Sequence, residues 1–307
     1  MSVFTSVSEE DMRHFLQNYE IGDLIELKGI AQGVTNTNYF VTTTKNRYVL
    51  TVFEVLKADE LPFYLELMKF LSKRGVVAPE PIEQRQGQLF GFLHDKPACL
   101  ISCLSGSDVD IANNEQCFEV GAMLAKMHDV GQHFELNMAN PRFSHWWNEQ
   151  SEQLYALLPK QDAQLLKDTL YDLNNKPDTD LPSGAIHADL FKDNVLIDGN
   201  KVTGFIDFYY ACNGSFIYDL AIAINDWART DTHTIDQEKM NSMLSGYKSV
   251  RSLTLAEEQY LNTAQQAACI RFWVSRALDF YFPAEGEMTY VKNPDTFKNL
   301  LVWLRQQ

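Results

Sequence analysis

The chain has 307 residues, a length that favours two domains or one two-lobed unit. It carries 26 basic and 41 acidic residues, which gives a net charge of −15. Because a surface this acidic repels phosphate backbones and anionic lipids, we expect neither a nucleic-acid partner nor a membrane partner. Hydrophobic residues make up 45% of the chain, enough for a large core, but no apolar stretch approaches the ~20 residues of a membrane span.

The cysteines and the N-terminal residues indicate the cellular compartment in which the protein is expected to work. The five cysteines are scattered, their number is odd, and no C-x-x-C pair occurs, which argues against a disulfide framework and a zinc site. The N-terminal residues lack a basic patch followed by an apolar segment, so no secretory signal is expected. The sequence therefore predicts a cytoplasmic protein that acts on a small molecule. It leaves open whether that protein is a monomer or a homodimer.

The first hundred residues show mainly the pattern of strands. Side chains alternate over 39–44, the Lys45-Asn46 pair favours a tight turn, and 47–54 is again β-branched and aromatic, which predicts a hairpin. From 59 to 73 apolar side chains recur at helical spacing, and Arg74-Gly75 marks the end of that helix. The other strands predicted in this region cover residues 26–32, 88–93 and 98–104.

Helical periodicity dominates after the connector Ser105-Gly106-Ser107, and short strand-like pieces over 184–208 interrupt it. This order predicts an α+β protein with two lobes. A small antiparallel sheet with one helix would occupy residues 1–104, and a larger, mainly helical lobe would occupy residues 105–307. Small ligands usually bind between two such lobes. The predicted helices lie at about 114–130, 150–175, 217–228, 236–248, 256–281 and 295–305.

One segment of the predicted C-terminal lobe combines several reactive side chains. His187, Asp189 and Asn194 have the spacing H-x-D-x-x-x-x-N, and Asp207 follows within Ile-Asp-Phe. A strand ends at His187, and a hairpin between Asn194 and Asp207 can bring those two side chains together. Their oxygens suit Mg²⁺, which takes few protein ligands and completes its shell with substrate phosphates. Asp189 would then face an acceptor hydroxyl.

Phosphoryl transfer requires this arrangement. The transition state is loose, so the protein mainly positions the hydroxyl, holds metal on the phosphates and spreads charge. An isolated aspartate titrates near ~4, so Asp189 cannot deprotonate an alcohol early, but it can orient the hydroxyl and accept its proton as the new P–O bond forms. We assign Asp189 that role. His187 and His128 are expected to be structural, His187 by holding the loop through hydrogen bonds.

The segment HADLFKDN followed by IDF resembles the catalytic signature of the aminoglycoside phosphotransferase and choline kinase group, which is related to the protein kinases. Within that group, the blocks GIAQGVTNTNYFV, YVLTVFE, YDLAIAINDW and RFWVSR resemble the kinase-like homoserine kinases, and the similarity covers nearly the whole chain. The resemblance implies a bilobal protein-kinase-like fold. It also implies that ATP, with Mg²⁺, phosphorylates the side-chain hydroxyl of L-homoserine to O-phospho-L-homoserine, a step in threonine biosynthesis.

The resemblance also implies roles for individual residues. It makes Asp189 the catalytic base, and it makes Asn194 and Asp207 the magnesium ligands. Two segments of the N-terminal lobe would bind the nucleotide, one by covering the phosphates and the other by pairing with adenine. These residues are Gly33, Val34, Thr35, Asn36 and Asn38 in the phosphate-covering turn, and Ser102 and Leu104 in the adenine hinge.

The third strand departs from the kinase pattern. Such folds usually carry a lysine there that binds the α- and β-phosphates, whereas this chain has Thr51. The kinase-like homoserine kinases resemble this chain in sharing that replacement of the lysine. Lys192 and Lys57 are the candidates for the missing cation. Glu66 is not given the usual ion-pair role of the helix glutamate, because its lysine partner is absent.

A site for homoserine needs a cation for the carboxylate and an anion for the amine. Arg271 and Arg276 lie five residues apart on one predicted helix, about 140° apart around its axis, so only one can face a given pocket. Arg271 is preferred for the carboxylate, and Arg276 is the alternative. Asp226 is the candidate for the amine, with Trp227 as a wall of the site. Asp219 is expected to brace the catalytic loop.

Two other interpretations stay open. The chain could be a neighbouring kinase of the same fold that phosphorylates choline, ethanolamine, methylthioribose or an aminoglycoside. A trimethylammonium acceptor would require an aromatic cage and no carboxylate clamp. The chain could also be a nucleotide-binding pseudokinase that works as a scaffold. The missing lysine supports that interpretation, and the presence of Asp189, Asn194 and Asp207 opposes it.

Overall fold

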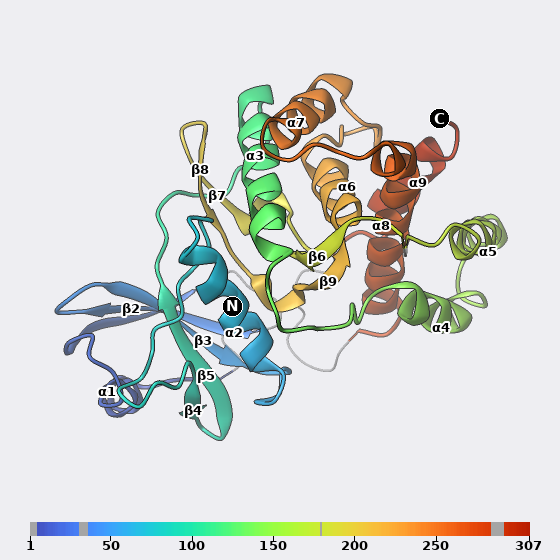
Figure 1. The fold of residues 1–307 in the computed structure, drawn as a ribbon. Coiled ribbons are helices and arrows are strands. Elements are labelled where there is room, and N and C mark those ends of the chain that lie inside the picture. The colour runs from blue at the N-terminus through green and yellow to red at the C-terminus, as the bar shows by residue number, and fades with distance from the viewer. Residues whose placement is uncertain (1–4, 31–35, 179, 284–291) are drawn as a thin grey trace. The chain divides into compact units, whose positions relative to one another are not determined.

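The computed structural model describes residues 5–30, 36–178, 180–283 and 292–307. The chain divides after Ser105 into two compact units, which we call unit 1 (residues 1–105) and unit 2 (residues 106–307) (Figure 1). Unit 1 combines an antiparallel sheet with helices and unit 2 is mainly helical, so the predicted α+β class is confirmed. Within the described ranges, no helix is both long and apolar enough to cross a membrane.

The strands of unit 1 are β1 (Leu24–Ile30), β2 (Asn36–Thr43), β3 (Arg47–Phe53), β4 (Gly91–Leu93) and β5 (Lys96–Ser102). They form one sheet in the order β1-β2-β3-β5-β4, and all neighbours are antiparallel. β2 and β3 form the predicted hairpin, in which Asn38 lies opposite Thr51. Because side chains alternate between the faces of a strand, Leu50 and Val52 enter the core while Thr51 lies on the other face.

Helix α1 (Glu9–Leu16) precedes the sheet and is absent from the prediction, which gives this lobe one helix. The Ser8 hydroxyl accepts a hydrogen bond from the Asp11 N–H, and the Asp11 carboxylate accepts one from the Ser8 N–H, which is a capping box. At 8 residues the helix is too short to be stable alone. Met12 and Phe15 pack into the core beneath the sheet and supply that stability.

Helix α2 (Leu61–Ser72) confirms the helix predicted over 59–73. Pro62 lies in its first turn, where a missing N–H costs no helical hydrogen bond. The chain leaves the helix through Gly75, whose φ of 78° lies in the left-handed region that glycine adopts readily. The helix is apolar on its buried face, so it packs within unit 1 through Leu61, Leu65, Met68 and Leu71.

Unit 2 is built around helix α6 (Phe216–Trp227), whose side chains are all buried. A helix that is enclosed on every side has a fixed position, and so do the acidic residues Asp219 and Asp226 that it carries. The long helix α8 (Leu255–Tyr281) packs along it (Figure 1). The other α-helices described in unit 2 are α3 (Asn114–Gly131), α4 (Ser144–Leu154), α5 (Lys160–Asn174), α7 (Gln237–Val250) and α9 (Asp295–Leu304).

Helices α3 and α7 touch backbone to backbone, because each has a glycine at the contact. A Cβ atom on Gly121 would overlap the carbonyl oxygen of Met243, and a Cβ on Gly246 would overlap the carbonyl oxygen of Phe118. A packed interior has no room for such an overlap, so a larger residue at either position would force the helices apart.

Two antiparallel ribbons complete unit 2. β6 (Ser183–Ile186) pairs with β9 (Cys212–Ser215), and β7 (Val195–Asp198) pairs with β8 (Lys201–Phe205). The β7–β8 pair is the hairpin predicted between Asn194 and Asp207, so that prediction is confirmed. β9 is absent from the prediction, because its sequence Cys-Asn-Gly-Ser shows no alternation of apolar and polar side chains.

Candidate active site

Residues 187–194, which we call the 187–194 loop, connect β6 to β7. Asp219, in the first turn of α6, is fully buried, and its carboxylate accepts hydrogen bonds from the N–H groups of His187 (2.8 Å) and Ala188 (2.7 Å). Ala188 has a φ of 60°, a conformation that costs a residue with a side chain about 1–3 kcal/mol. The two hydrogen bonds that the Asp219 carboxylate accepts offset that cost, so the predicted bracing role of Asp219 is confirmed.

His187 is also part of the support of this loop. Its ring is fully buried, and Nε2 lies 2.9 Å from the carbonyl oxygen of Ile206, just after β8. Burial lowers the pKa of His187, so the ring is neutral and donates through Nε2. The expected structural role of His187 is therefore confirmed.

Asp189 and Asn194 contact each other directly within the loop. The Asn194 side-chain Nδ2 donates to the backbone oxygen of Asp189 (2.8 Å) and to its carboxylate Oδ2 (3.2 Å). Since the nitrogen of the amide is turned toward Asp189, its oxygen Oδ1 points the other way. Burial raises the pKa of Asp189, and the charge of Arg271, 3.8 Å from Oδ1, acts against that shift.

Asp207 follows β8 in a left-handed backbone conformation, with φ 61° and ψ 57°. Burial raises the pKa of Asp207 to about 7, and repulsion from the charges of Asp189 and Asp193 adds to the shift. Carboxylates held this close destabilise one another unless a cation neutralises them. The β7–β8 hairpin is responsible for this approach, because the Ile206 N–H donates to the carbonyl oxygen of Asn194 over 3.0 Å.

The donor set fits a hard divalent cation. The carboxylate of Asp207 and the amide oxygen of Asn194 are the ligands that Mg²⁺ prefers, and the raised pKa of Asp207 reports a place where a cation would be favourable. Across the part of the chain that the structure describes, no group of three or more His, Cys, Asp and Glu side chains is arranged to hold a metal. A metal here would therefore need further oxygens, such as those of a substrate phosphate.

The C-terminal end of α6 holds the same loop. The backbone N–H of Lys192 donates to Asp226 Oδ2 over 3.0 Å, and Trp227 Nε1 donates to the carbonyl oxygen of Leu190 over 3.3 Å. Asp226 keeps its second oxygen, Oδ1, 3.7 Å from the guanidinium of Arg229. Trp227 is 1% exposed, so it supports the loop from the interior of the unit.

The two arginines of α8 have different surroundings. Arg271 is buried, donates to the carbonyl oxygen of Ala188 and forms the ion pair with Asp189. Arg276 is half-buried, and its guanidinium lies over the ring of Phe297, 4.6 Å from the centroid. Burial lowers the pKa of Arg276. Of these two cations, Arg271 is the one in contact with the loop.

The predicted phosphate-covering turn lies in unit 1 and is only partly described. Gly33, Val34 and Thr35 lie outside the described residues, whereas Asn36 and Asn38 are the first and third residues of β2. Thr51, which stands in place of the usual lysine, donates from its hydroxyl to Asn38 Oδ1 over 2.8 Å. The Nδ2 of Asn38 is therefore turned away from Thr51.

The predicted hinge follows directly from β5. Ser102 is the last residue of that strand, its hydroxyl accepts from the N–H of Glu80 over 2.8 Å, and Leu104 is half-buried just beyond it. The two candidate lysines differ in place and exposure. Lys57 is exposed after β3, whereas Lys192 is half-buried in the 187–194 loop, three residues after Asp189.

Two charged residues near the loop are absent from the predicted site. Lys292 forms a 2.9 Å ion pair with Asp193, and Arg229 lies beside Asp226. The sequence separation of 99 residues between Lys292 and Asp193 leaves no local signal to find. Arg229 follows Asp226 by three positions, a spacing at which helical side chains contact each other. The contact between these two residues could therefore have been predicted from the sequence.

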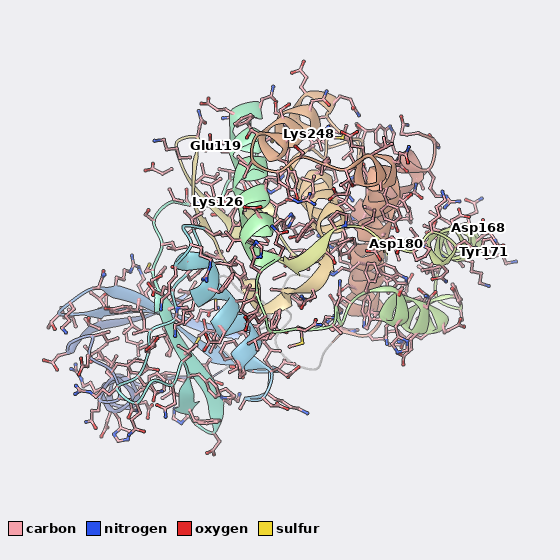
Figure 2. All side chains as sticks on the ribbon, viewed as in Figure 1. Glu119, Lys126, Asp168, Tyr171, Asp180 and Lys248 are labelled. Carbon is pink, nitrogen blue, oxygen red and sulfur yellow. The ribbon has the colours of Figure 1, made fainter. Side chains whose placement is uncertain are left out.

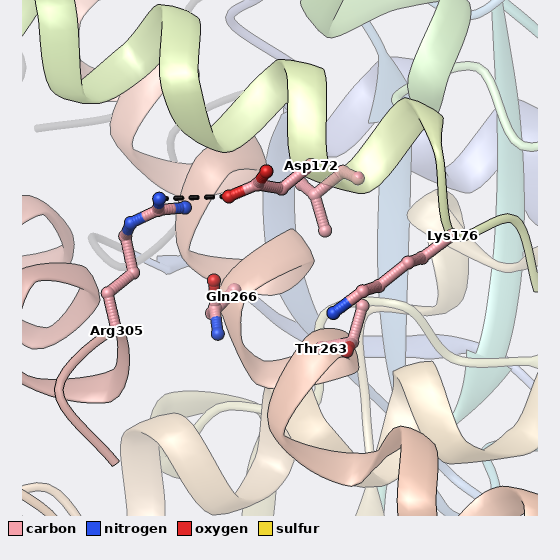
Figure 3. Close-up of a pocket in the computed structure, with 6 residues that line it drawn as sticks. Asp172, Lys176, Thr263, Gln266 and Arg305 are labelled. Carbon is pink, nitrogen blue, oxygen red and sulfur yellow. Dashed lines mark ion pairs between the residues drawn. The ribbon is translucent and has the colours of Figure 1, made fainter.

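A separate pocket of about 150 Å³ lies in unit 2 and contains none of the residues above (Figure 3). Arg305 and Asp172 form a 2.9 Å ion pair at this pocket, so their charges neutralise each other. The remaining lining residues are Leu173, Lys176, Thr263 and Gln266. The pocket therefore has no carboxylate comparable to Asp207, whose pKa is raised by burial and by repulsion from Asp189 and Asp193.

Comparison with known sequences places these features in a family. A sequence model described as the phosphotransferase enzyme family matches residues 26–253. A homoserine kinase of Neisseria meningitidis serogroup B is 55% identical over 304 residues, which cover 99% of this chain and 100% of that protein. A homoserine kinase of Methylobacillus flagellatus is 44% identical over 98% of this chain and 94% of that protein.

Solved structures agree on the fold. An amicoumacin kinase in complex with AMP-PNP, Ca²⁺ and Ami has a TM-score of 0.74 at 16% identity, over 98% of this chain and 93% of that one. A spectinomycin phosphotransferase in complex with ADP has a TM-score of 0.67 at 14% identity, over 96% and 94% of the two chains. The resemblance found in the sequence is thus confirmed. The chain belongs to the phosphotransferase enzyme family, and the two relatives named above, which align with nearly the whole chain, are homoserine kinases.

Proposed function

We propose that this protein is a homoserine kinase, which transfers the γ-phosphoryl group of ATP to the side-chain hydroxyl of L-homoserine with the help of Mg²⁺. The product is O-phospho-L-homoserine, and the reaction serves threonine biosynthesis in the cytoplasm. The observation that carries the proposal is the 55% identity to a homoserine kinase over 99% of this chain.

Asp189 is the catalytic base in this proposal. Burial raises the pKa of Asp189, so its carboxylate takes up a proton more readily than an exposed aspartate does. The contacts with Asn194 and Arg271 fix both carboxylate oxygens in place. A carboxylate held in this way orients the acceptor hydroxyl and receives its proton as the bond to phosphorus forms.

Asn194 and Asp207 hold the Mg²⁺ in this proposal. A bound Mg²⁺ would neutralise the negative charge that develops on the phosphoryl group during transfer. The proposal is supported by the orientation of the Asn194 amide, whose nitrogen is engaged by Asp189, and by the pKa of Asp207, which burial and the charges of Asp189 and Asp193 raise. Lys192, in the same loop, is the proposed phosphate contact.

The nucleotide is proposed to bind to the N-terminal lobe, residues 1–104. Gly33, Val34, Thr35, Asn36 and Asn38 would cover its phosphates, and the segment from Ser102 to Leu104 would pair with adenine. The Thr51 hydroxyl donates to Oδ1 of Asn38, so the Nδ2 of Asn38 is left as a neutral hydrogen-bond donor. This orientation supports the proposal that Asn38 contacts the phosphates.

The acceptor is proposed to bind through Asp226, Trp227 and Arg271. Asp226 offers a carboxylate oxygen to the ammonium group, and Arg271 lies beside Asp189, where the acceptor hydroxyl must also be. Trp227 fixes the loop against which the acceptor would rest. Arg276 stays the alternative partner for the carboxylate of the acceptor. Its guanidinium lies over the ring of Phe297.

The test is a panel of acceptors with Mg-ATP: L-homoserine, choline, ethanolamine, methylthioribose and an aminoglycoside. We expect kcat/KM for L-homoserine to exceed that for each of the others by about 10³-fold or more, because a site built for a charged group rejects molecules that leave it unpaired. Asp189→Asn, prepared in parallel, controls for contaminating kinases. A higher kcat/KM for choline or ethanolamine would overturn the proposal, and so would a lack of turnover with every acceptor.

A further inference from the structure

The hydrogen bonds that hold the 187–194 loop continue into the interior of unit 2. His128 of α3 lies behind Asp219, with its Nε2 3.0 Å from Asp219 Oδ2. The other ring nitrogen, Nδ1, lies 2.7 Å from the hydroxyl of Tyr247 on α7. Arg251, directly after α7, donates to that same hydroxyl over 3.2 Å. Asp219, His128 and Tyr247 are all 0% exposed.

These hydrogen bonds form a line that runs from Asp219 through His128 and Tyr247 to Arg251. The protonation states of the groups along this line follow from burial and from the hydrogen bonds. Burial lowers the pKa of His128, so its ring is neutral and carries one N–H. The pKa of Asp219 is lowered, because the hydrogen bonds from His128 and the loop outweigh the opposing effect of burial. Asp219 is therefore an ionised acceptor, and His128 must donate to it through Nε2.

The tautomer with its proton on Nε2 leaves Nδ1 as an acceptor, and the Tyr247 hydroxyl is the group that donates to it. The oxygen of Tyr247 accepts from Arg251 in turn, so each polar group on this line has a partner. The other tautomer would set the lone pair of Nε2 against the ionised carboxylate of Asp219. Two acceptors that face each other in a buried site are strongly unfavourable.

We propose that Tyr247 is a positioning residue for phosphoryl transfer. Its hydroxyl donates to Nδ1 of His128 and so holds the ring with its Nε2–H aimed at Asp219. Asp219 then keeps the N–H groups of His187 and Ala188 in place and so fixes the backbone that carries Asp189. The inference rests on the proposed role of Asp189 as the base.

Arg251 holds the outer end of this line. Its guanidinium forms a 2.9 Å ion pair with Glu257, which is 0% exposed at the start of α8. It also lies over the ring of Phe216, 4.8 Å from the centroid, and the imidazole of His128 stacks on the same ring. The Tyr247 hydroxyl therefore has a fixed donor on one side and a fixed acceptor on the other.

The backbone contact between α3 and α7 sets the distance from Tyr247 to His128. Gly246, the residue before Tyr247, lies directly against the carbonyl oxygen of Phe118 on α3. The tyrosine ring therefore starts from a helix that cannot move closer. Its hydroxyl reaches Nδ1 without a water between them, as the 2.7 Å separation shows.

The first experiment determines the tautomer in the unmodified protein at neutral pH. Protein labelled with ¹⁵N-histidine is examined by long-range ¹H–¹⁵N NMR, and the His128 signals are assigned by their loss in His128→Gln. We expect a neutral ring with its proton on Nε2. A proton on Nδ1, or a doubly protonated ring, would overturn the inference. No substrate is needed, so this result is independent of the proposed reaction.

The second experiment compares Tyr247→Phe with Tyr171→Phe, a matched change of a tyrosine that is 71% exposed on α5 (Figure 2). We expect Tyr247→Phe to lower kcat about tenfold and to leave both KM values within about twofold, because the residue acts on Asp189 and not on substrate binding. In Tyr247→Phe the His128 proton should stay on Nε2, because Asp219 still accepts it, whereas the Nδ1 signal should shift, because Nδ1 has lost its donor. Tyr171→Phe should match the wild type in both measurements.

Two outcomes of the second experiment would overturn the inference. One is a folded Tyr247→Phe protein with wild-type kcat, and the other is a lower kcat with the Nδ1 signal of His128 unchanged. If Tyr247→Phe does not fold, the tautomer measured in the unmodified protein still decides. If no acceptor is phosphorylated by the wild type, the proposed function fails while the NMR result stands on its own.

Discussion

Arg271 forms an ion pair with Asp189, with 3.8 Å between the guanidinium Nη1 and the carboxylate Oδ1. The same guanidinium donates to the carbonyl oxygen of Ala188, which has a left-handed backbone. One buried cation therefore supports the loop and also lowers the pKa of Asp189 against the effect of burial. A change at Arg271 must alter the shape of the loop and the charge of Asp189, the proposed base, together.

Asp189→Asn should lower kcat by about 10²–10⁴-fold and leave the KM for ATP nearly unchanged. Asparagine can keep the hydrogen bond from Asn194, but it cannot accept the proton of the acceptor hydroxyl. Steady-state kinetics with L-homoserine provide the measurement. Asp198→Asn is the control, because Asp198 is an exposed carboxylate on β7. A kcat near the wild-type value in Asp189→Asn would refute the role of Asp189 as base.

An analogue can assign the acceptor carboxylate to one arginine. 3-Aminopropan-1-ol is homoserine without its carboxylate, and we expect the wild type to prefer homoserine by about 10²-fold or more in kcat/KM. Arg271→Gln should remove most of this preference. It should also lower kcat, because Arg271 contacts Asp189. Arg276→Gln should keep the preference, and its loss in Arg276→Gln alone would transfer the clamp to Arg276.

Gly246→Ala should lower the free energy of unfolding by about 1–3 kcal/mol, because the added methyl group would overlap the backbone of α3 at Phe118. Urea denaturation measures the change. Ser245→Ala is the matched control, since Ser245 is the exposed neighbour on the same helix and should change stability by less than about 0.5 kcal/mol. Equal stability of the two variants would mean that α3 and α7 do not touch as described.

Stability should depend on pH in the neutral range. Burial lowers the pKa of His128 and of His187 below the ordinary value of 6.5. Below about pH 6.5 the unfolded chain therefore binds protons at these rings that the folded chain does not bind. The contribution of each ring is complete above that pH and is lost as the pH falls toward the folded pKa, by up to about 1.4 kcal/mol per pH unit.

Urea denaturation at several pH values between about 7 and 5 tests this dependence. His128→Gln should reduce the slope of stability against pH, since glutamine does not titrate. His145→Gln should leave the slope as it is, because the His145 side chain is 97% exposed. An unchanged slope in His128→Gln would show that the folded chain does not keep His128 neutral.

The elements with a strong local pattern could be predicted from the sequence. The β2–β3 hairpin has alternating side chains and a polar turn, and α3 begins where Asn113 provides a cap, with a capping box completed by Gln116. Two elements lack such a pattern. Helix α1 is too short to show a period, and β9 depends on its pairing with β6, about 30 residues earlier in the chain.

The candidate site could be predicted where it is local and not where it depends on distant residues. The loop with Asp189 and Asn194 and the hairpin that returns to Asp207 follow from their spacing in the sequence. The surroundings of Arg271 do not, because Arg271 and Ala188 are 83 residues apart and Arg276 satisfies the same sequence argument. Tyr247 likewise gives no sign in the sequence of its contact with His128, 119 residues away.

In the proposed reaction Asp189, Asn194 and Asp207 meet at one metal ion and one alcohol, and the Mg²⁺ dependence of homoserine phosphorylation tests this arrangement most directly. Asp207→Asn is compared with the wild type and with Asp198→Asn, a change of an exposed carboxylate on β7. We predict that Asp207→Asn lowers kcat about 10²-fold or more and needs about tenfold more Mg²⁺, whereas Asp198→Asn matches the wild type. An Asp207→Asn protein with wild-type kcat and wild-type Mg²⁺ dependence would contradict the account.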